Sequence, residues 1–286
     1  MNLQIISHKD SEIEQFREKI LKYVQTYESM GLKYWLFLCA SNPVAIVYYG
    51  KEPVNLIAPI GTPLCMIQIL DYEKSQNCIE EIAKKTLSMG KKHSVKYVFV
   101  PSIPEKQTKV IQTFKEQGFK EKAHWYRMDR SLDDIPSPPE ILRFENVEKD
   151  KVREFLESAG HCTNGSYEGE TMVNLAGVPD MLLNFWYEMQ ELYFVYKDNE
   201  MIGILNLTPS SQSNLNNIGV APEFRSKGFG KQILLYALER LKDLGMERVG
   251  LRVHIKNTRA TGLYKSFGFN ITEQHVDLIH WEDNSH

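Results

Sequence analysis

Short apolar runs alternate along the chain with segments that carry apolar residues three or four positions apart. The first pattern predicts strands and the second predicts helices. In the first half, the patterns predict helices at residues 10–21 and 78–89, and strands at residues 3–7, 35–39, 44–49, 54–58, 64–70 and 96–100. Helix 78–89 is expected to end at Gly90, since glycine is common just after a helix C-terminus.

The second half continues in the same way. Its patterns predict a helix at 150–158 and strands at residues 141–144, 192–196, 201–207, 249–255 and 271–281. Within it, a β-branched run at 218–222 stops at a proline, a turn with two glycines follows, and residues 231–244 have the apolar spacing of a helix that ends at Gly245. This succession of strand, glycine turn and helix is the centre of the chain.

The turn Arg225-Ser-Lys-Gly-Phe-Gly230 has the composition of a phosphate site. Its glycines leave successive N–H groups uncovered at the start of a helix, where the helix dipole adds partial positive charge. Arg225, Lys227 and Lys231 add cations, and the glycines are expected to tolerate no side chain. Neither common nucleotide motif fits, because no Gly-Lys-Ser/Thr follows and Ile233 stands where a dinucleotide fingerprint has its third glycine.

A second motif follows the strand at 249–255. Asn257 is expected to cap a last helix, which closes at a Gly-Phe pair. The residues of this motif are Asn257, Ala260, Leu263, Tyr264, Gly268 and Phe269. Over about residues 200–270 the two motifs resemble the signature of the GNAT superfamily of acyl-CoA-dependent N-acetyltransferases, which is Arg/Gln-x-x-Gly-x-Gly/Ala and then Asn-x-x-Ala-x-x-Leu-Tyr-x-x-x-Gly-Phe. Every signature position is filled.

The resemblance implies an α/β (α+β) fold of two tandem GNAT-like domains, each a mixed, mostly antiparallel twisted sheet flanked by helices. It also implies acetyl-CoA as cosubstrate, and direct attack by a primary amine of a small molecule or peptide. The coenzyme pyrophosphate would lie on the amides of the turn, and the N–H of Val220 would stabilise the oxyanion. Tyr264 would protonate the leaving thiolate. The residues expected to bind the coenzyme are Ile218, Gly219, Val220, Arg225, Ser226, Lys227, Gly228, Phe229, Gly230, Lys231, Asn257 and Tyr264.

The strand before the turn carries two further expectations. Gly219 predicts a β-bulge that separates two strands and makes room for the pantetheine arm. Many GNAT enzymes place a glutamate on this strand as the base, whereas this chain has only asparagines there, at 214, 216 and 217. The alternatives are a water held by Asn216, His254, or an acid of residues 161–191 such as Glu188, and the base is left open.

Residues 161–191 are expected to cover the acceptor site. Their acidic and aromatic side chains predict a cationic amine acceptor, through charge and cation–π contact. These side chains are Tyr167, Glu168, Glu170, Asp180, Trp186, Tyr187, Glu188 and Glu191.

The first half is interpreted as a divergent copy of the second. Residues 110–119 align with residues 260–269, 150 positions later. The copy has the glycine-free segment Asp71–Gln76 in place of the phosphate turn, and Phe114 in place of Tyr264. We therefore expect a degenerate domain at 1–132 that binds no coenzyme A, a Pro-rich linker at 133–140 and a catalytic domain at 141–286.

Composition narrows the remaining classes. A formal charge of -3 and the absence of a basic stripe give no reason to expect a nucleic-acid partner. Without a long apolar segment, the protein is expected to be cytoplasmic and not membrane-bound. The four cysteines, at 39, 65, 78 and 162, lack the spacing of disulfide or metal-binding pairs, which predicts buried free thiols and no metal site. Oligomeric state is left open.

The competing hypothesis is a non-catalytic acyl-CoA-binding sensor or scaffold. The missing strand glutamate favours it. Tyr264 opposes it more strongly, because a sensor needs no proton donor.

Overall fold

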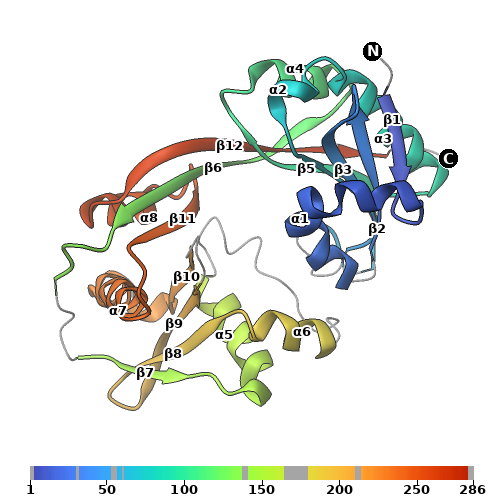
Figure 1. Ribbon diagram of the computed structural model, residues 1–286. Coiled ribbons are helices and arrows are strands. Elements are labelled where there is room, and N and C mark those ends of the chain that lie inside the picture. The colour runs from blue at the N-terminus through green and yellow to red at the C-terminus, as the bar shows by residue number, and fades with distance from the viewer. Residues whose placement is uncertain are drawn as a thin grey trace. The chain divides into compact units, whose positions relative to one another are not determined.

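The computed structural model describes residues 3–29, 32–52, 57–59, 61–136, 141–163, 180–209 and 214–282 (Figure 1). The chain forms two compact units. Unit 1 comprises residues 1–53, 57–124 and 274–286, and unit 2 comprises residues 54–56 and 125–273.

Unit 1 is a mixed sheet flanked by helices. Its strands lie in the order β1 (Leu3–Ser7), β2 (Lys33–Cys39), β3 (Asn42–Lys51), β4 (Pro63–Ile69), β5 (Tyr97–Pro104) and the C-terminal part of β12 (Asn270–Trp281). Only β4 and β5 are parallel among these pairs. Its helices are the 3-10 helix η1 (Ser11–Phe16), α1 (Arg17–Ser29), α2 (Tyr72–Ser75), α3 (Ile79–Lys92) and α4 (Thr108–Glu116). Apolar residues of α3 and α4 form one core with the sheet, and η1 and α1 form a second.

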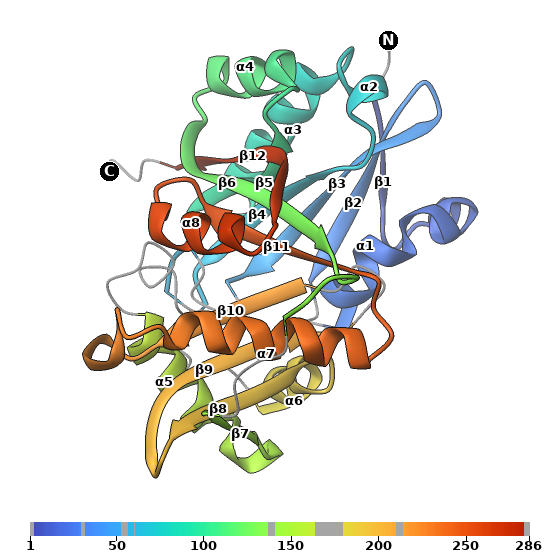
Figure 2. The ribbon, with the colours of Figure 1, turned by 90° about the vertical axis from the view of Figure 1, so that its left-hand side faces the viewer.

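Unit 2 has the same kind of sheet. Its strands lie in the order β6 (Lys120–Ser131), β11 (Arg248–His254), β10 (Asn214–Val220), β9 (Glu200–Thr208), β8 (Glu191–Lys197) and β7 (Arg143–Asn146), and only β10 and β11 are parallel. Its helices are η2 (Lys149–Lys151), α5 (Val152–Thr163), α6 (Asp180–Tyr187), η5 (Pro222–Phe224), α7 (Phe229–Asp243) and α8 (Thr258–Ser266). Figure 2 shows α7 across β8, β9 and β10, with α5 and α6 on the other face.

The Gly-Phe pairs that revealed the internal repeat have the same structural role in both units. In unit 2, the N–H of Phe269 donates to the carbonyl of Tyr264 and the N–H of Gly268 donates to that of Lys265. These are the two hydrogen bonds of a Schellman cap, in which the residue after the glycine packs on the last helical turn. Accordingly, the rings of Phe269 and Tyr264 lie 5.6 Å apart. The repeat therefore preserves a way of ending a helix.

Unit 1 repeats this cap 150 residues earlier. Phe119 donates its N–H to the carbonyl of Phe114, Gly118 donates to Lys115, and the two phenylalanine rings are 5.0 Å apart. The aligned helices α4 and α8 thus end in the same way.

The expected end of a helix at Gly90 is wrong. Helix α3 continues to Lys92, and Ser94, at φ 53°, takes the left-handed cap position. Gly90 lies one turn earlier, and a Cβ there would stand 2.9 Å from a methyl group of Val95. Glycine is needed at this position because Val95 packs over the helix.

The compact units divide the chain differently from the expected boundary at 133–140. Residues 125–131 of β6 pair with β11 in unit 2, and residues 275–281 of β12 pair with β5 in unit 1. Each sheet is thus completed by a strand from beyond the linker. Hydrophobic patterning identifies strands but not their partners. The sequence therefore could not show that β6 and β12 are exchanged between the two sheets.

The other predicted elements in the described segments are present, with differences mainly at their ends. Helix 10–21 extends to Ser29, and the strand expected at 54–58 falls mostly outside the described residues. The four cysteines are buried and unbridged, as predicted. None of the described helices has the length and hydrophobicity needed to cross a membrane.

The exchanged strand gives a test of the domain boundary. Fragment 133–273 lacks the partner of β11 along all seven paired residues, together with the fully buried side chains of Met128 and Leu132. Each large buried side chain contributes about 2–5 kcal/mol, against the 5–15 kcal/mol of a typical domain. We expect fragment 125–273 to unfold cooperatively in thermal circular dichroism and fragment 133–273 to show no transition. Equal melting curves would contradict this.

Candidate active site

The site begins where β10 separates from β11. Strand β10 pairs with β9 from Asn214 to Val220, but among the described residues it pairs with β11 only where Asn214 faces Gly250. The register against β9 shifts between Leu215 and Asn217, which places a β-bulge at Asn216. A bulge bends its strand and increases the local twist, which accounts for the separation.

The expected bulge at Gly219 is therefore wrong in position. Gly219 pairs in register with Ile204. A Cβ at Gly219 would lie 2.7 Å from the Cβ of Cys162, so the glycine is required by the close approach of α5 to β10.

A cavity of about 810 Å³ opens between the separated strands, which is the size of small-molecule and cofactor sites. It brings together ten of the twelve residues expected to bind a coenzyme, namely Ile218, Val220, Arg225, Ser226, Gly228, Phe229, Gly230, Lys231, Asn257 and Tyr264. The other two do not line it. Gly219 faces Cys162, and the ammonium of Lys227 lies 5.2 Å from the centre of the Phe224 ring.

The turn before α7 is held in a left-handed conformation at two positions. Ser226 has φ 65° and Gly228 has φ 87°. Left-handed residues in a turn aim successive backbone N–H groups into one concavity, and the N-terminus of α7 follows at once. The turn thus has the geometry of an anion site.

Arg225 joins three elements at this turn. Its Nε donates to the carbonyl of Val220 at 2.9 Å, and its Nη2 donates to the carbonyl of Cys162, in the last turn of α5, at 3.0 Å. These carbonyls need partners, because the last carbonyls of a helix and those of an unpaired strand edge have none of their own. Arg225 is therefore more than the cation expected beside the turn.

The edge of β10 that faces β11 has backbone groups directed toward the cavity. The N–H of Ala221 donates to Ile202 on β9. Successive residues of a strand direct their backbone groups to alternate sides, so the N–H of Val220 points away from β9. Val220 also lines the cavity.

The cavity is strongly positive. Among the described residues that line it, none is acidic or histidine, and five are cationic, namely Arg225, Lys231, Arg252, Lys256 and Arg259. The N-termini of α7 and α8 add partial positive charge, because Gly228 and Asn257, the residues that begin them, both line the cavity. The arrangement favours a ligand with several negative charges.

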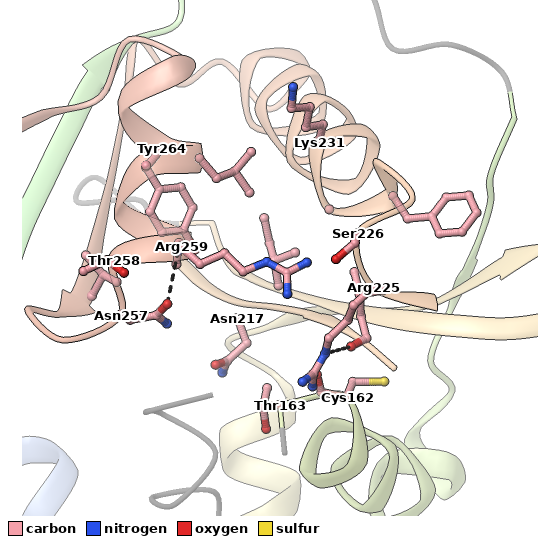
Figure 3. A pocket seen from close by; sticks show the side chains of 18 of the residues that line it. Cys162, Thr163, Asn217, Arg225, Ser226, Lys231, Asn257, Thr258, Arg259 and Tyr264 are labelled. Carbon is pink, nitrogen blue, oxygen red and sulfur yellow. Dashed lines mark hydrogen bonds between the residues drawn. The ribbon is translucent and has the colours of Figure 1, made fainter. Parts of the chain in front are cut away.

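Sequence reasoning missed Arg252, Lys256 and Arg259. The signal that could have found them is their place next to the second motif, since Arg252 lies in the strand before Asn257 and Lys256 and Arg259 flank it. Figure 3 shows Arg259 in the space between Tyr264 and Ser226.

Helix α8 supplies Asn257 and Tyr264. The predicted cap is confirmed, because the Asn257 side chain accepts a hydrogen bond from the N–H of Ala260 at 3.1 Å. Tyr264 is half-buried, with one side of its ring toward Phe269, and it lines the cavity. The Schellman cap thus fixes the position of the phenol.

His254 and Glu188, two of the residues considered for the base, lie away from the cavity. His254 is 2% exposed, its ring packs edge-on against Trp125 at 5.1 Å, and its Nδ1 accepts the N–H of Lys256. Glu188 forms an ion pair with Lys149 at 2.8 Å. Neither lines the cavity, whereas Asn216 does. The Nδ2 of Asn216 donates to Gln190 at 2.9 Å, which fixes its orientation.

The described acids of residues 161–191 are all paired within the protein. Asp180 contacts Arg153 at 2.6 Å, and Glu191 accepts two hydrogen bonds from Arg240 and one from Tyr193. Burial raises the pKa of Glu191, but these hydrogen bonds outweigh it and lower the pKa overall. Tyr167, Glu168 and Glu170 lie outside the described residues.

The aromatic residues of this region have structural roles. The Tyr187 hydroxyl donates to the carbonyl of Val147, and Trp186 packs against the core beneath α5. The described acidic and aromatic residues of this region thus make contacts within the protein, and none of them lines the cavity.

The corresponding part of unit 1 differs in its strand pairing and in its side chains. Strands β4 and β5 stay paired over three residues, Leu64 to Met66. The carboxylate of Asp71 caps α2 by accepting the N–H of Lys74 at 2.9 Å, and this hydrogen bond lowers its pKa. Phe114, at the position of Tyr264, is fully buried.

Comparisons with known proteins agree with this geometry. Residues 158–269 match the model of the acetyltransferase (GNAT) family. The chain is 27% identical over 94 residues to a mycothiol acetyltransferase of Corynebacterium glutamicum strain R, which is 32% of each chain. It is 29% identical over 91 residues to a putative [ribosomal protein bS18]-alanine N-acetyltransferase of Bacillus subtilis strain 168, covering 30% of this chain and 60% of that protein. The chain thus spans about a third of the length of the mycothiol relatives.

A solved structure extends the likeness to the whole chain. A tandem GNAT protein from the clavulanic acid biosynthesis pathway superposes with a TM-score of 0.65 at 12% identity, and the alignment covers 100% of both chains. The predicted fold class of two tandem GNAT-like domains is confirmed.

The two turn glycines should respond differently to substitution. Gly228→Ala is expected to lower the free energy of unfolding by about 1–2 kcal/mol, since alanine at φ 87° is strained. Gly230→Ala should leave it unchanged or raise it by about 0.5–1 kcal/mol, because its Cβ would meet side chains no closer than 3.9 Å and alanine favours a helix. Urea unfolding measures both, and an equal loss in the two variants would contradict the assignment. If Gly230→Ala is as stable as expected, any intolerance to a side chain at Gly230 comes from contact with the ligand.

Proposed function

We propose that this protein is an N-acetyltransferase, because residues 158–269 match the model of the acetyltransferase (GNAT) family. It transfers the acetyl group of acetyl-CoA to a primary amine of a small molecule or peptide by direct attack. The observation that carries the proposal is a single cavity that joins the left-handed turn, the open edge of β10 and Tyr264.

The turn and the strand edge bind the coenzyme. The backbone amides of residues 225–231 hold the pyrophosphate at the N-terminus of α7. The arm of the coenzyme lies along Ile218–Val220, where its amide groups take the place of a neighbouring strand. The N–H of Val220, which points away from β9, donates to the thioester oxygen and stabilises the charge that develops there.

Tyr264 protonates the departing thiolate. A phenol of pKa about 10 and a thiol of pKa about 8.5 make this transfer uphill by about 2 kcal/mol, which is small for a catalysed step. The amine loses its proton through a water held by Asn216, which lines the cavity, whereas His254 and Glu188 do not.

Unit 1 binds no coenzyme and acts as a structural partner. The carboxylate of Asp71, which caps the short helix α2 before α3, would repel a phosphate, and Phe114 has no proton to give. The expected absence of a metal remains a prediction.

Calorimetric titration with acetyl-CoA tests the site. The 286-residue chain should bind it at one site, and Gly228→Glu should abolish binding because it puts bulk and negative charge into the turn. Gly245→Glu is the matched control, since Gly245 has φ 81° and open space around it at the far end of α7. Absence of binding by the unmodified protein would overturn the proposal.

Tyr264→Phe separates an enzyme from a non-catalytic sensor. We expect kcat to fall about 10²- to 10⁴-fold with no change in acetyl-CoA affinity, because the variant keeps the ring packed on Phe269 and removes only the hydroxyl group that donates the proton. Thiol release is followed with a panel of primary amines. Tyr236→Phe, on α7 and outside the cavity, is the control. An undiminished kcat in Tyr264→Phe would refute the role, and binding without turnover in the unmodified protein would favour the sensor.

A further inference from the structure

Arg259 lines the cavity but has no role in the proposed chemistry. It lies two residues after the cap Asn257, its side chain is exposed, and it lines the cavity. Figure 3 shows the side chain extending from α8 toward Ser226 and Arg225, across the space between Tyr264 and the turn. In the same view Lys231 points away from Ser226.

The cations around Arg259 are engaged with protein groups. Arg225 donates to two backbone carbonyls, Arg252 lies 5.1 Å from the centre of the Trp125 ring, and Lys227 lies over Phe224. Within the described part of the chain, Arg259 itself makes no hydrogen bond, ion pair or ring contact. Its five N–H donors are therefore available to a ligand.

A guanidinium is suited to phosphate, because its planar donors bind two phosphate oxygens at once. The backbone amides of the turn can contact an anion from one side only, and Arg259 approaches the turn from α8, on the other side of the cavity. Described lining residues include no carboxylate that would compete for it.

We infer that Arg259 closes over the pyrophosphate of acetyl-CoA, opposite the turn, and thereby selects an acyl donor that carries phosphate. The inference rests on the proposed function. Arg259 is assigned to the pyrophosphate, and not to the 3′-phosphate, because its side chain is directed at the turn.

Calorimetry on the 286-residue chain tests this role with two probes, acetyl-CoA and 3′-dephospho-acetyl-CoA. Arg259→Ala should weaken binding of both by a similar factor, about tenfold to a hundredfold, as expected for a charge-assisted hydrogen-bonded contact. Arg259→Lys should recover part of the loss, since it keeps the charge without the planar fork. Lys265→Ala is the control, because it removes a cation from the same helix outside the cavity.

The possible outcomes distinguish a failure of the role of Arg259 from a failure of the proposed function. Unchanged affinity in Arg259→Ala, with normal binding by the unmodified protein, would overturn the role of Arg259 alone. A loss confined to acetyl-CoA would overturn the pyrophosphate assignment, since only that probe carries the 3′-phosphate. Failure of the unmodified protein to bind either probe would instead remove the proposed function.

Discussion

The single residue pair at which β10 meets β11 is the constraint on which the candidate site depends. Strand β10 is held along its length by β9, so its other edge carries backbone groups that need partners. Arg225 takes one of them, the carbonyl of Val220. The rest of this edge faces a cavity with two helix N-termini at its margin, which suits a long ligand with amide groups and an anionic end.

The two units differ at only a few of the features that form the candidate site. Both end the aligned helix with the same glycine cap, so that feature serves folding and is independent of chemistry. In unit 1 the strands stay paired for longer, and the carboxylate of Asp71 caps the short helix α2. In unit 2 the bulge at Asn216 separates the strands, and left-handed residues leave the amides of the turn uncovered.

Local chemistry was predictable from the sequence, whereas contacts between distant elements were not. Glycine spacing located the turn, and the cap Asn257 and the helix around Tyr264 followed from short motifs. The roles of Gly219 and Gly90 were predicted wrongly. Each glycine leaves room for a side chain that packs closely on it, Cys162 on Gly219 and Val95 on Gly90, and hydrophobic patterning does not show these contacts. The exchange of β6 and β12 was missed for the same reason. Arg259 was overlooked because an arginine on an exposed helix start has no signal of its own until the cavity in front of it is known.

The crowding of like charge in the cavity links binding to stability. Five cationic side chains line one space, and two helix N-termini add to them. Such an arrangement is unfavourable in the free domain, since like charges near a low-dielectric wall repel one another. A polyanionic ligand relieves this repulsion when it binds, so part of its affinity comes from the like charge that these elements bring together. The repulsion is a cost of function, and the buried face of α7, with Ile233, Leu234, Ala237, Leu238 and Leu241 fully covered, offsets it.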